Sequence, residues 1–234
     1  MVRIAFDKEA VLAGHFLLRH LTRDELRRLA AAAELANYKA RATIFMKGDP
    51  GGSMMAVIRG RVKICSHSVD GKELTLNIIN RGGLFGEIAL LDGEPRTADA
   101  VALEETDLLV LDRARFLPFL AANPEIALRL LCMLCKRLRQ TSEHLEDVLF
   151  LEASPRLARW LLRLGETVGK PGADGTRLDI KLSQQQLGSL VGVSRESVNK
   201  SLGDWQRAGV IAVEGGQILL RDPKALGEIA MSAE

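Results

Sequence analysis

At residues 183–202 the sequence is SQQQLGSLVGVSRESVNKSL, and this stretch carries the clearest local structural signal in the chain. Ser183 and Ser194 each precede a short amphipathic segment, as residues that cap the N-terminus of a helix do. Gly192 lies in the tight turn between the two segments. Apolar side chains on the inward face would lock the two helices together; they are Leu187, Leu190, Val193, Val198 and Leu202. The stretch therefore predicts a helix-turn-helix.

The second of these helices would expose a polar N-terminal face. Arg pairs with guanine through two hydrogen bonds, and Glu accepts from cytosine, so such a face suits the edges of DNA bases. The alternative is a solvated, charged helix start in an ordinary helical domain. A hairpin pattern at 210–220, with Gly215 and Gly216 at its turn, fits a wing and favours DNA binding. The predicted DNA contacts are Ser183, Gln184, Ser194, Arg195, Glu196, Ser197, Asn199 and Lys200.

Upstream of this motif, a long helix is predicted from Pro124 to about Leu151, without an internal Gly or Pro. About 27 residues correspond to roughly 40 Å of helix. Apolar residues alternate at spacings of four and three, and Thr141 is the polar member of the series. Such a heptad pattern predicts a two-stranded coiled coil. The alternative is a helix that packs on its own β-domain. The predicted seam is Ala127, Leu131, Leu134, Leu138, Thr141, Leu145 and Val148.

Before the long helix, the sequence alternates between short apolar runs and Gly-rich turns. Runs at 43–45, 54–58, 62–64, 74–79 and 108–111 predict a small β-barrel or β-roll that ends near Asp112. A helix from the Thr22 capping box through Glu34 is expected before it, and a helix capped by Ser154 and extending to Leu164 after the long one. The predicted fold class is α+β, with a β-roll domain at 1–122, a dimerisation helix at 123–152 and a winged helix-turn-helix domain at 153–234.

The segment from Gly82 to Ala98 contains a candidate anion site. Gly86 permits close backbone approach, and a helical turn from Glu87 to Leu91 would direct its first amides at an anion. Arg96, a few residues further on, has the fixed fork and permanent charge that suit a phosphate. Glu87 would repel a phosphate but can accept from a sugar hydroxyl. The alternative is a surface turn with a Glu–Arg ion pair.

With these motifs in place, the chain resembles the Crp/Fnr family of bacterial regulators, in particular its cAMP receptor protein branch. The resemblance extends from about residue 16 to residue 220. Three stretches carry it: Phe85-Gly86-Glu87 with Arg96-Thr97-Ala98, residues 136–143 of the long helix, and residues 193–198 of the helix-turn-helix.

The resemblance implies roles for individual residues. Glu87 would bind the ribose 2′-hydroxyl, and Arg96 and Thr97 the cyclic phosphate, together with Gly86 and the backbone of Ile88 and Ala89. Thr141, and Ser142 from a second subunit, would contact the purine. In the DNA-binding helix, Lys200 stands where the family usually has Arg and Asn199 where it has a small residue. Because Thr97 matches a Thr of cGMP-selective domains, cGMP is predicted as a ligand beside cAMP.

Composition and cysteine content exclude several other classes. The net charge of +2 is only mildly basic, so any DNA contact must come from local placement of Arg and Lys. We expect no membrane segment, a cytoplasmic location, no cofactor and no enzymatic activity. Cys132 and Cys135 lack a second ligand pair, so no metal site is expected. Cys65 with His67 is a conceivable haem pair, but both would lie on one face of a single strand.

The sequence thus predicts a homodimeric regulator that responds to a cyclic nucleotide, binds double-stranded palindromic DNA and contacts RNA polymerase. The first alternative keeps the fold with another effector or none. The second is a cyclic nucleotide-binding module that regulates an enzyme, which the helix-turn-helix disfavours.

Overall fold

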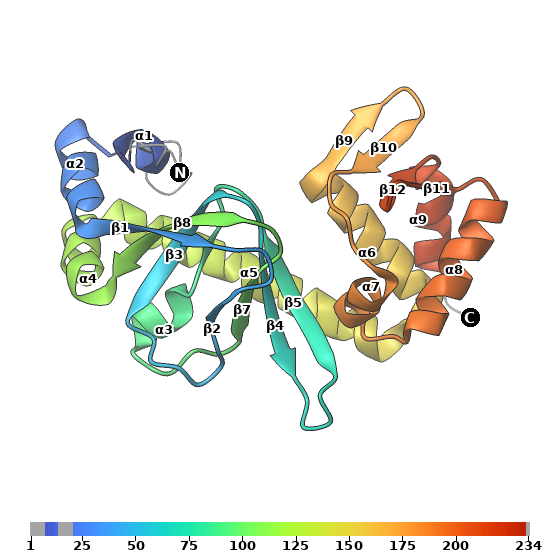
Figure 1. Cartoon of the computed structure of the whole chain (residues 1–234), viewed down its shortest axis with the longest axis horizontal. Coiled ribbons are helices and arrows are strands. Elements are labelled where there is room, and N and C mark those ends of the chain that lie inside the picture. The colour runs from blue at the N-terminus through green and yellow to red at the C-terminus, as the bar shows by residue number, and fades with distance from the viewer. Residues whose placement is uncertain (1–7, 14–20, 233–234) are drawn as a thin grey trace. The chain divides into compact units, whose positions relative to one another are not determined.

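The computed structural model describes residues 8–13 and 21–232 (Figure 1). Packing divides the described chain into two compact units. The first comprises residues up to 66 and 76–137, and the second comprises 67–75 and 138 onward. The division falls inside the long helix α5 (Pro124–Phe150). α5 has the 27 residues predicted for it, without interruption, and contributes to both units.

The first unit is a β-roll with short helices, and residues 67–75 at the tip of its β4–β5 hairpin are the part grouped with the second unit. Its β-roll strands form two four-stranded sheets, in the orders β1-β8-β3-β6 and β2-β7-β4-β5. The β1–β8, β3–β8 and β4–β7 pairs are antiparallel. The elements are α1 (Lys8–Ala13), α2 (Arg23–Ala32), β1 (Ala33–Tyr38), β2 (Thr43–Phe45), β3 (Ser53–Arg59), β4 (Val62–His67), β5 (Glu73–Ile79), β6 (Leu84–Phe85), α3 (Glu87–Asp92), β7 (Asp99–Ala102), β8 (Thr106–Asp112) and α4 (Arg113–Ala122). The predicted strands and the predicted end of the roll near Asp112 are confirmed.

Strand β3 explains how the roll is filled. Its residues 54–58 are all buried, and successive side chains of a strand point to opposite faces. Met54, Ala56 and Ile58 join the cluster that includes Leu26 and Ile126, on the helical side of the sheet. Met55 and Val57 join a second cluster with Phe85 and Leu108 inside the roll. One strand therefore contributes to two cores.

The expected first helix is partly wrong. The capping box at Thr22 is present, but helix α2 ends at Ala32 instead of continuing through Glu34. The next six residues form β1, which pairs along its whole length with β8, from Ala33 opposite Leu111 to Tyr38 opposite Thr106. Hydrogen bonding to β8 overrides the helix propensity of this Ala- and Leu-containing segment, because tertiary pairing outweighs local propensity.

The second unit is mainly helical with one four-stranded sheet of order β11-β12-β10-β9. Its core includes Leu157 and Leu161 of α6, Leu187 of α7 and Trp205 of α8, all buried. The elements are the C-terminal half of α5, α6 (Ala153–Val168), β9 (Gly169–Gly172), β10 (Gly175–Leu178), α7 (Gln184–Val191), α8 (Arg195–Arg207), β11 (Ile211–Glu214), β12 (Gln217–Leu220) and α9 (Pro223–Met231). The predicted helix-turn-helix and hairpin are confirmed.

One expectation in this unit is corrected, and one hairpin is an addition to the predicted elements. Ser154 lies inside α6 and does not cap it; the helix begins at Ala153, two residues before the predicted start at Pro155, and continues to Val168 instead of Leu164. The stretch after α6 is a β-hairpin, β9–β10, and β10 pairs with β12 through Thr176 opposite Leu220. Its Gly-rich, weakly apolar sequence lacks the alternation by which a strand is recognised.

Among the described residues, no single helix has the length and hydropathy needed to cross a membrane. Only α4 together with α5 passes that test, as a pair bent by 111°.

Candidate functional site

The first unit contains a pocket lined by the β6–α3 segment, the loop before β7, and single residues of β2, β4 and α5. The six residues predicted for the nucleotide-binding loop segments all line it. The full lining is Phe45, Ile64, Phe85, Gly86, Glu87, Ile88, Ala89, Arg96, Thr97, Ala98 and Arg137. The wall therefore combines apolar side chains with one carboxylate and two guanidinium groups.

Arg96 is the most constrained charged group of this wall. It is only 5% exposed, and its guanidinium lies 4.2 Å from the centre of the Phe45 ring. Nη1 donates to the carbonyl of Gly86 at 2.9 Å and Nη2 to the Ser53 hydroxyl at 3.1 Å. The buried Nε has no hydrogen-bond partner among the described residues. Burial lowers the pKa of Arg96, against the charges of Asp49 and Glu87, which raise it; a fixed cation with a free donor is suited to an anion.

Gly86 brings the backbone close to this arginine. It precedes α3 in the left-handed conformation, with a φ of 78°. A Cβ at this position would lie 2.7 Å from Nη1 of Arg96 and 3.3 Å from the Ser53 carbonyl oxygen. Both the conformation and the contact therefore require glycine. The helical turn predicted after Gly86 is confirmed as α3.

Glu87 is buried, with 2% of its surface exposed, and its carboxylate pairs with Arg137 of α5. The second terminal nitrogen of Arg137 donates to the carbonyl of Leu84. Arg137 thus ties α5 to both sides of the β6–α3 turn. The pairing of Glu87 is with Arg137, whereas Arg96 is held by Gly86 and Ser53; a simple Glu87–Arg96 surface ion pair is not what the structure contains.

Sequence reasoning did not single out Arg137 or Phe45. Arg137 lies in the quoted 136–143 stretch, but its position outside the apolar seam gave no sign of a contact with Glu87. Thr141 and Ser142 follow one turn further along α5; both side chains are exposed and neither belongs to the pocket lining. Their proposed contact with a purine stays a prediction.

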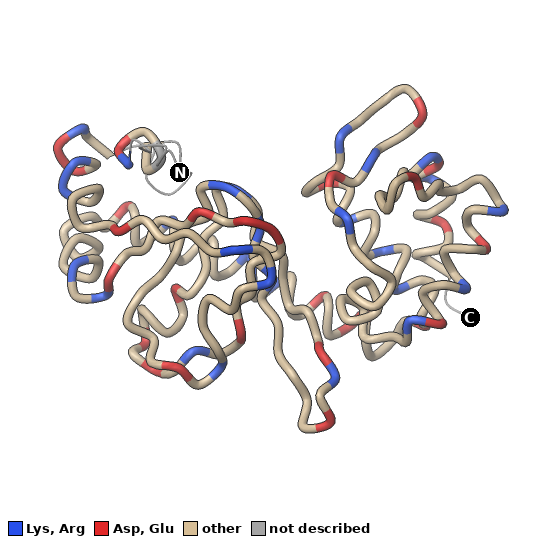
Figure 2. Tube along the Cα trace, viewed as in Figure 1, with Lys and Arg blue, Asp and Glu red and all other residues tan. Residues whose placement is uncertain are grey.

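In the second unit, the helix-turn-helix has the capping predicted for it. The Ser183 hydroxyl accepts from the Gln186 amide at 3.2 Å, and the Ser194 hydroxyl accepts from the Ser197 amide at 3.1 Å. Gly192, between the helices, has a φ of 69°. Four polar side chains are exposed on the first two turns of α8: Arg195, Glu196, Asn199 and Lys200. Figure 2 shows acidic and basic residues interspersed along the chain of both units.

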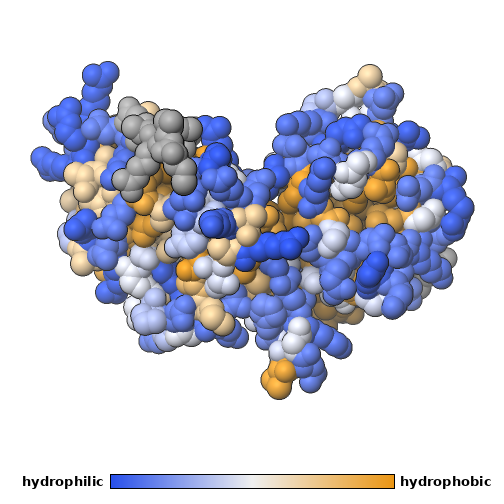
Figure 3. Space-filling model, in the orientation of Figure 1, coloured by the Kyte–Doolittle hydropathy of each residue, from blue (hydrophilic) through white to orange (hydrophobic). Residues whose placement is uncertain are grey.

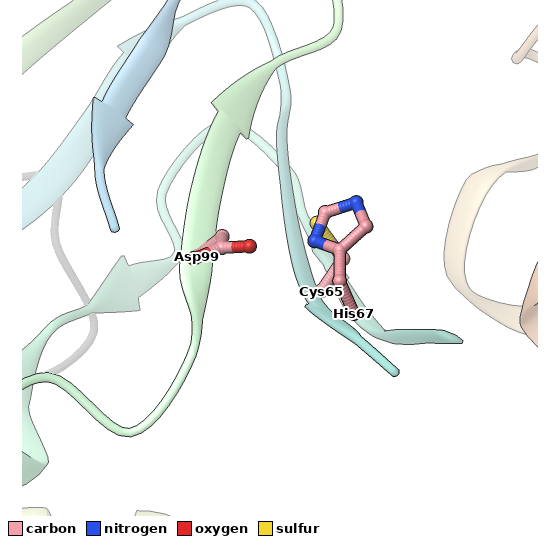
Figure 4. Close-up of side chains that lie close together, drawn as sticks. All are labelled: Cys65, His67 and Asp99. Atoms are coloured by element: carbon pink, nitrogen blue, oxygen red, sulfur yellow. The ribbon is translucent and has the colours of Figure 1, made fainter. Parts of the chain in front are cut away.

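A second group of potential ligands lies on β4 and β7. Cys65 and Asp99 are register partners across these strands, and His67 follows two residues further along β4 (Figure 4). Asp99 accepts from the Lys47 amide at 2.7 Å, and His67 pairs with Glu73 at 3.6 Å. Asp99, at the start of β7, and His67, at the end of β4, therefore each have a polar partner within the protein.

Comparison with known proteins agrees with both units. Residues 35–123 match the cyclic nucleotide-binding domain family, and residues 155–229 match the Crp-like helix-turn-helix domain family. The chain is 36% identical over 188 residues to a CRP-like cAMP-activated global transcriptional regulator of Mycobacterium tuberculosis, with 80% of this chain and 84% of that protein covered. It is 35% identical to a cyclic AMP receptor protein of Thermus thermophilus, with 80% and 83% covered.

Solved structures show the same architecture. FixK2 from Bradyrhizobium japonicum superposes with a TM-score of 0.76 at 22% identity, with 86% of this chain and 99% of that chain covered; this likeness supports the fold. The relatives that this chain matches in sequence are transcription regulators and not enzymes. The two family matches cover the pocket residues from Phe45 to Ala98 and the helix-turn-helix. The chain is therefore a member of the Crp/Fnr family of transcription regulators, with a cyclic nucleotide-binding domain and a Crp-like helix-turn-helix.

Proposed function

We propose that the protein is a homodimeric transcription regulator that binds cAMP, and also cGMP, in the pocket of its first unit. The observation that carries this proposal is the buried Arg96 with an unpartnered Nε beside the buried carboxylate of Glu87. A cyclic phosphate would accept from Arg96 and from Thr97, and Glu87 would accept from the ribose hydroxyl next to it. The cAMP-activated relatives support this choice of ligand.

The exposed face of α5 supports a homodimer. Leu131, Leu138 and Leu145 of the predicted seam are 57%, 68% and 58% exposed in the single chain, and Val148 is 38% exposed. Ala127 and Leu134 are half-buried within the chain. The apolar patch at the tip of the β4–β5 hairpin is much smaller than this row of side chains (Figure 3), and Val69 is its exposed residue. A row of leucines on a 27-residue helix suits a second copy of the same helix.

Two helix-turn-helix units related by a two-fold axis would bind a palindromic double-stranded site. The half-sites would lie about one DNA turn apart, roughly 34 Å. Arg195, Glu196 and Lys200 would contact base edges, while Ser183, Gln184, Ser194, Ser197 and Asn199 would position α8 on the DNA. A regulator that acts on DNA would work in the cytoplasm and contact RNA polymerase. The alternative is the same fold with another effector or none.

Isothermal titration calorimetry with cAMP and cGMP tests the pocket. Arg96→Ala should weaken nucleotide binding by about 2–5 kcal/mol, because it removes a buried charge-assisted contact with the phosphate. Arg81→Ala, which removes an exposed arginine of the preceding turn, is the matched control and should bind as the native protein does. Unchanged affinity in the Arg96 variant, with a native circular dichroism spectrum, would reject the pocket assignment.

A further inference from the structure

Near its C-terminal end, α5 carries a buried carboxylate. Asp147 is 3% exposed. Its Oδ1 accepts from Nη1 of Arg159 at 2.6 Å, and its Oδ2 pairs with Nη1 of Arg163 at 2.9 Å. Both arginines belong to α6, so each carboxylate oxygen holds one side chain of the next helix. A buried aspartate is stable only with such partners, and the contact is therefore specific and not a chance surface pair.

The arginines of α6 form a row on one face of that helix. Arg156, Arg159 and Arg163 are spaced by three and four residues, as side chains on one helical face are. Arg159 also donates to the carbonyl of Ala230 in α9 at 3.2 Å. Arg156 donates to the carbonyl of Leu151 at 2.8 Å and to that of Val191, the last residue of α7, at 2.9 Å. Each of these bonds joins α6 to another helix of the same unit or to the residue that follows α5.

The contacts of this row lie on both sides of a break in the helical chain. α5 ends at Phe150 and α6 begins at Ala153, so Leu151 and Glu152 separate the two helices. Asp147 reaches across the break to α6 from the α5 side. Arg156 reaches back from α6 to the Leu151 carbonyl and forward to the first helix of the helix-turn-helix. A further ion pair between the described residues of α5 and α6 is the exposed pair of Glu143 with Arg163, at 3.6 Å.

We propose that Asp147 is a positioning residue that locks the last turns of α5 and helix α6 into one body across the Leu151–Glu152 break. A movement of α5 is then passed on through α6 to α7 and α8, because the chain does not bend at Leu151–Glu152. The inference rests on the proposed function for the signal that it relays, because that signal is nucleotide binding. The pocket holds α5 through Arg137, and Asp147 lies ten positions further along the same helix.

Asp147→Asn in the full-length protein tests the relay, since it keeps the shape of the side chain and removes its charge. The readout is the ratio of DNA affinities measured with and without saturating cAMP, by fluorescence anisotropy. We expect this ratio to fall at least tenfold while cAMP affinity, measured by calorimetry, stays within about twofold. Glu143→Gln is the matched control: it removes an exposed partner of the same Arg163, at 3.6 Å, and should leave the ratio unchanged. A native ratio in folded Asp147→Asn protein overturns the proposal.

A second measurement separates this proposal from the nucleotide assignment. Hydrogen exchange of the amides at 149–153 should be at least tenfold faster in Asp147→Asn than in Glu143→Gln, with no nucleotide added. If the DNA affinity of the native protein does not respond to cAMP, the proposed function is wrong. Equal exchange rates in the two variants would independently overturn the proposed role of Asp147. If Asp147→Asn does not fold, Arg163→Gln, which leaves the Asp147–Arg159 pair in place, serves in its stead, with a smaller change in the same direction expected.

Discussion

At the residue scale, the approach of Gly86 to Arg96 makes the pocket sensitive to a single methyl group. Gly86→Ala would place a Cβ 2.7 Å from Nη1 of Arg96 and displace the guanidinium. We expect nucleotide affinity to fall at least tenfold, as measured by calorimetry. Gly82→Ala is a matched control, because Gly82 has nearly the same φ, 77°, and no atom within 4 Å of the added Cβ. Equal losses in the two variants would mean that backbone strain alone is responsible.

Thr97 is the residue at which the two cyclic nucleotides are expected to differ. Thr97 lines the pocket next to Arg96 in the chain, and its side chain is exposed. A guanine in the syn conformation would place its 2-amino group near the phosphate, where a threonine hydroxyl can accept from it. Thr97→Ala should therefore weaken cGMP at least fivefold more than cAMP in competition binding. Equal losses for both nucleotides, or no cGMP binding by the native protein, would contradict this assignment.

His144 makes stability depend on pH. Burial is the largest cause that lowers its pKa from 6.5; Arg163 and Arg156 lower it further, while Asp147 opposes them. The folded state thus disfavours the protonated form. Its contribution to stability is complete above pH 6.5 and is lost as the pH falls toward the lower folded pKa. The free energy of unfolding of His144→Gln should consequently fall less between pH 7.5 and 5.5 than that of the native protein.

The sequence predicts the pocket residues that lie close together along the chain, but not those that are distant in the sequence and become neighbours only on folding. Gly86, Glu87 and Arg96 belong to one short segment with a recognisable composition. Phe45 and Arg137 come from β2 and α5, and only the closed roll brings them to that segment. An arginine in a helix rich in charged residues carries no local sign that its partner is a buried carboxylate 50 residues earlier.

At the element scale, prediction succeeds where local signals and tertiary contacts agree. α7 and α8 combine serine caps, a glycine turn and apolar periodicity, and all of these are present in the structure. β1 fails because Ala33–Tyr38 is a strand only through its six pairs with β8. The sequence does not predict β9 and β10, for a related reason. Gly169–Gly172 and Gly175–Leu178 have little alternation of apolar and polar residues, and β10 pairs with β12, more than 40 residues away.

α8 is the element whose role in DNA recognition can be tested most directly. Arg195, at its first turn, is exposed. Arg195→Ala should reduce discrimination at one guanine per half-site by about 1–3 kcal/mol, because a bidentate contact to that base is lost. Binding to a set of single-base variants of a selected site measures this. A uniform loss for all sequences would instead indicate a phosphate contact.

At the scale of the whole molecule, the exposed leucines of α5 predict the oligomeric state. Leu138→Glu would place a charge in the seam between two copies of the helix, where burial without a partner is costly. We expect sedimentation velocity to show a monomer at about 10 µM protein, a concentration at which the coiled-coil pattern predicts a dimer of the native chain. Leu76→Glu, at a leucine of β5 that is 49% exposed, should remain a dimer. A dimeric Leu138→Glu variant would place the interface elsewhere.

Because one uninterrupted helix carries both Arg137 and Asp147, the angle between these two side chains around the helix axis is fixed by a count of residues. Each residue inserted between them would add about 1.5 Å of length and turn one anchor by about 100° relative to the other. A single insertion would therefore point Asp147 away from α6 if Arg137 kept its hold on Glu87, whereas seven added residues would restore the phase to within about 20°. We therefore expect an insertion of seven residues between Arg137 and Asp147 to preserve the response to nucleotide far better than an insertion of one residue.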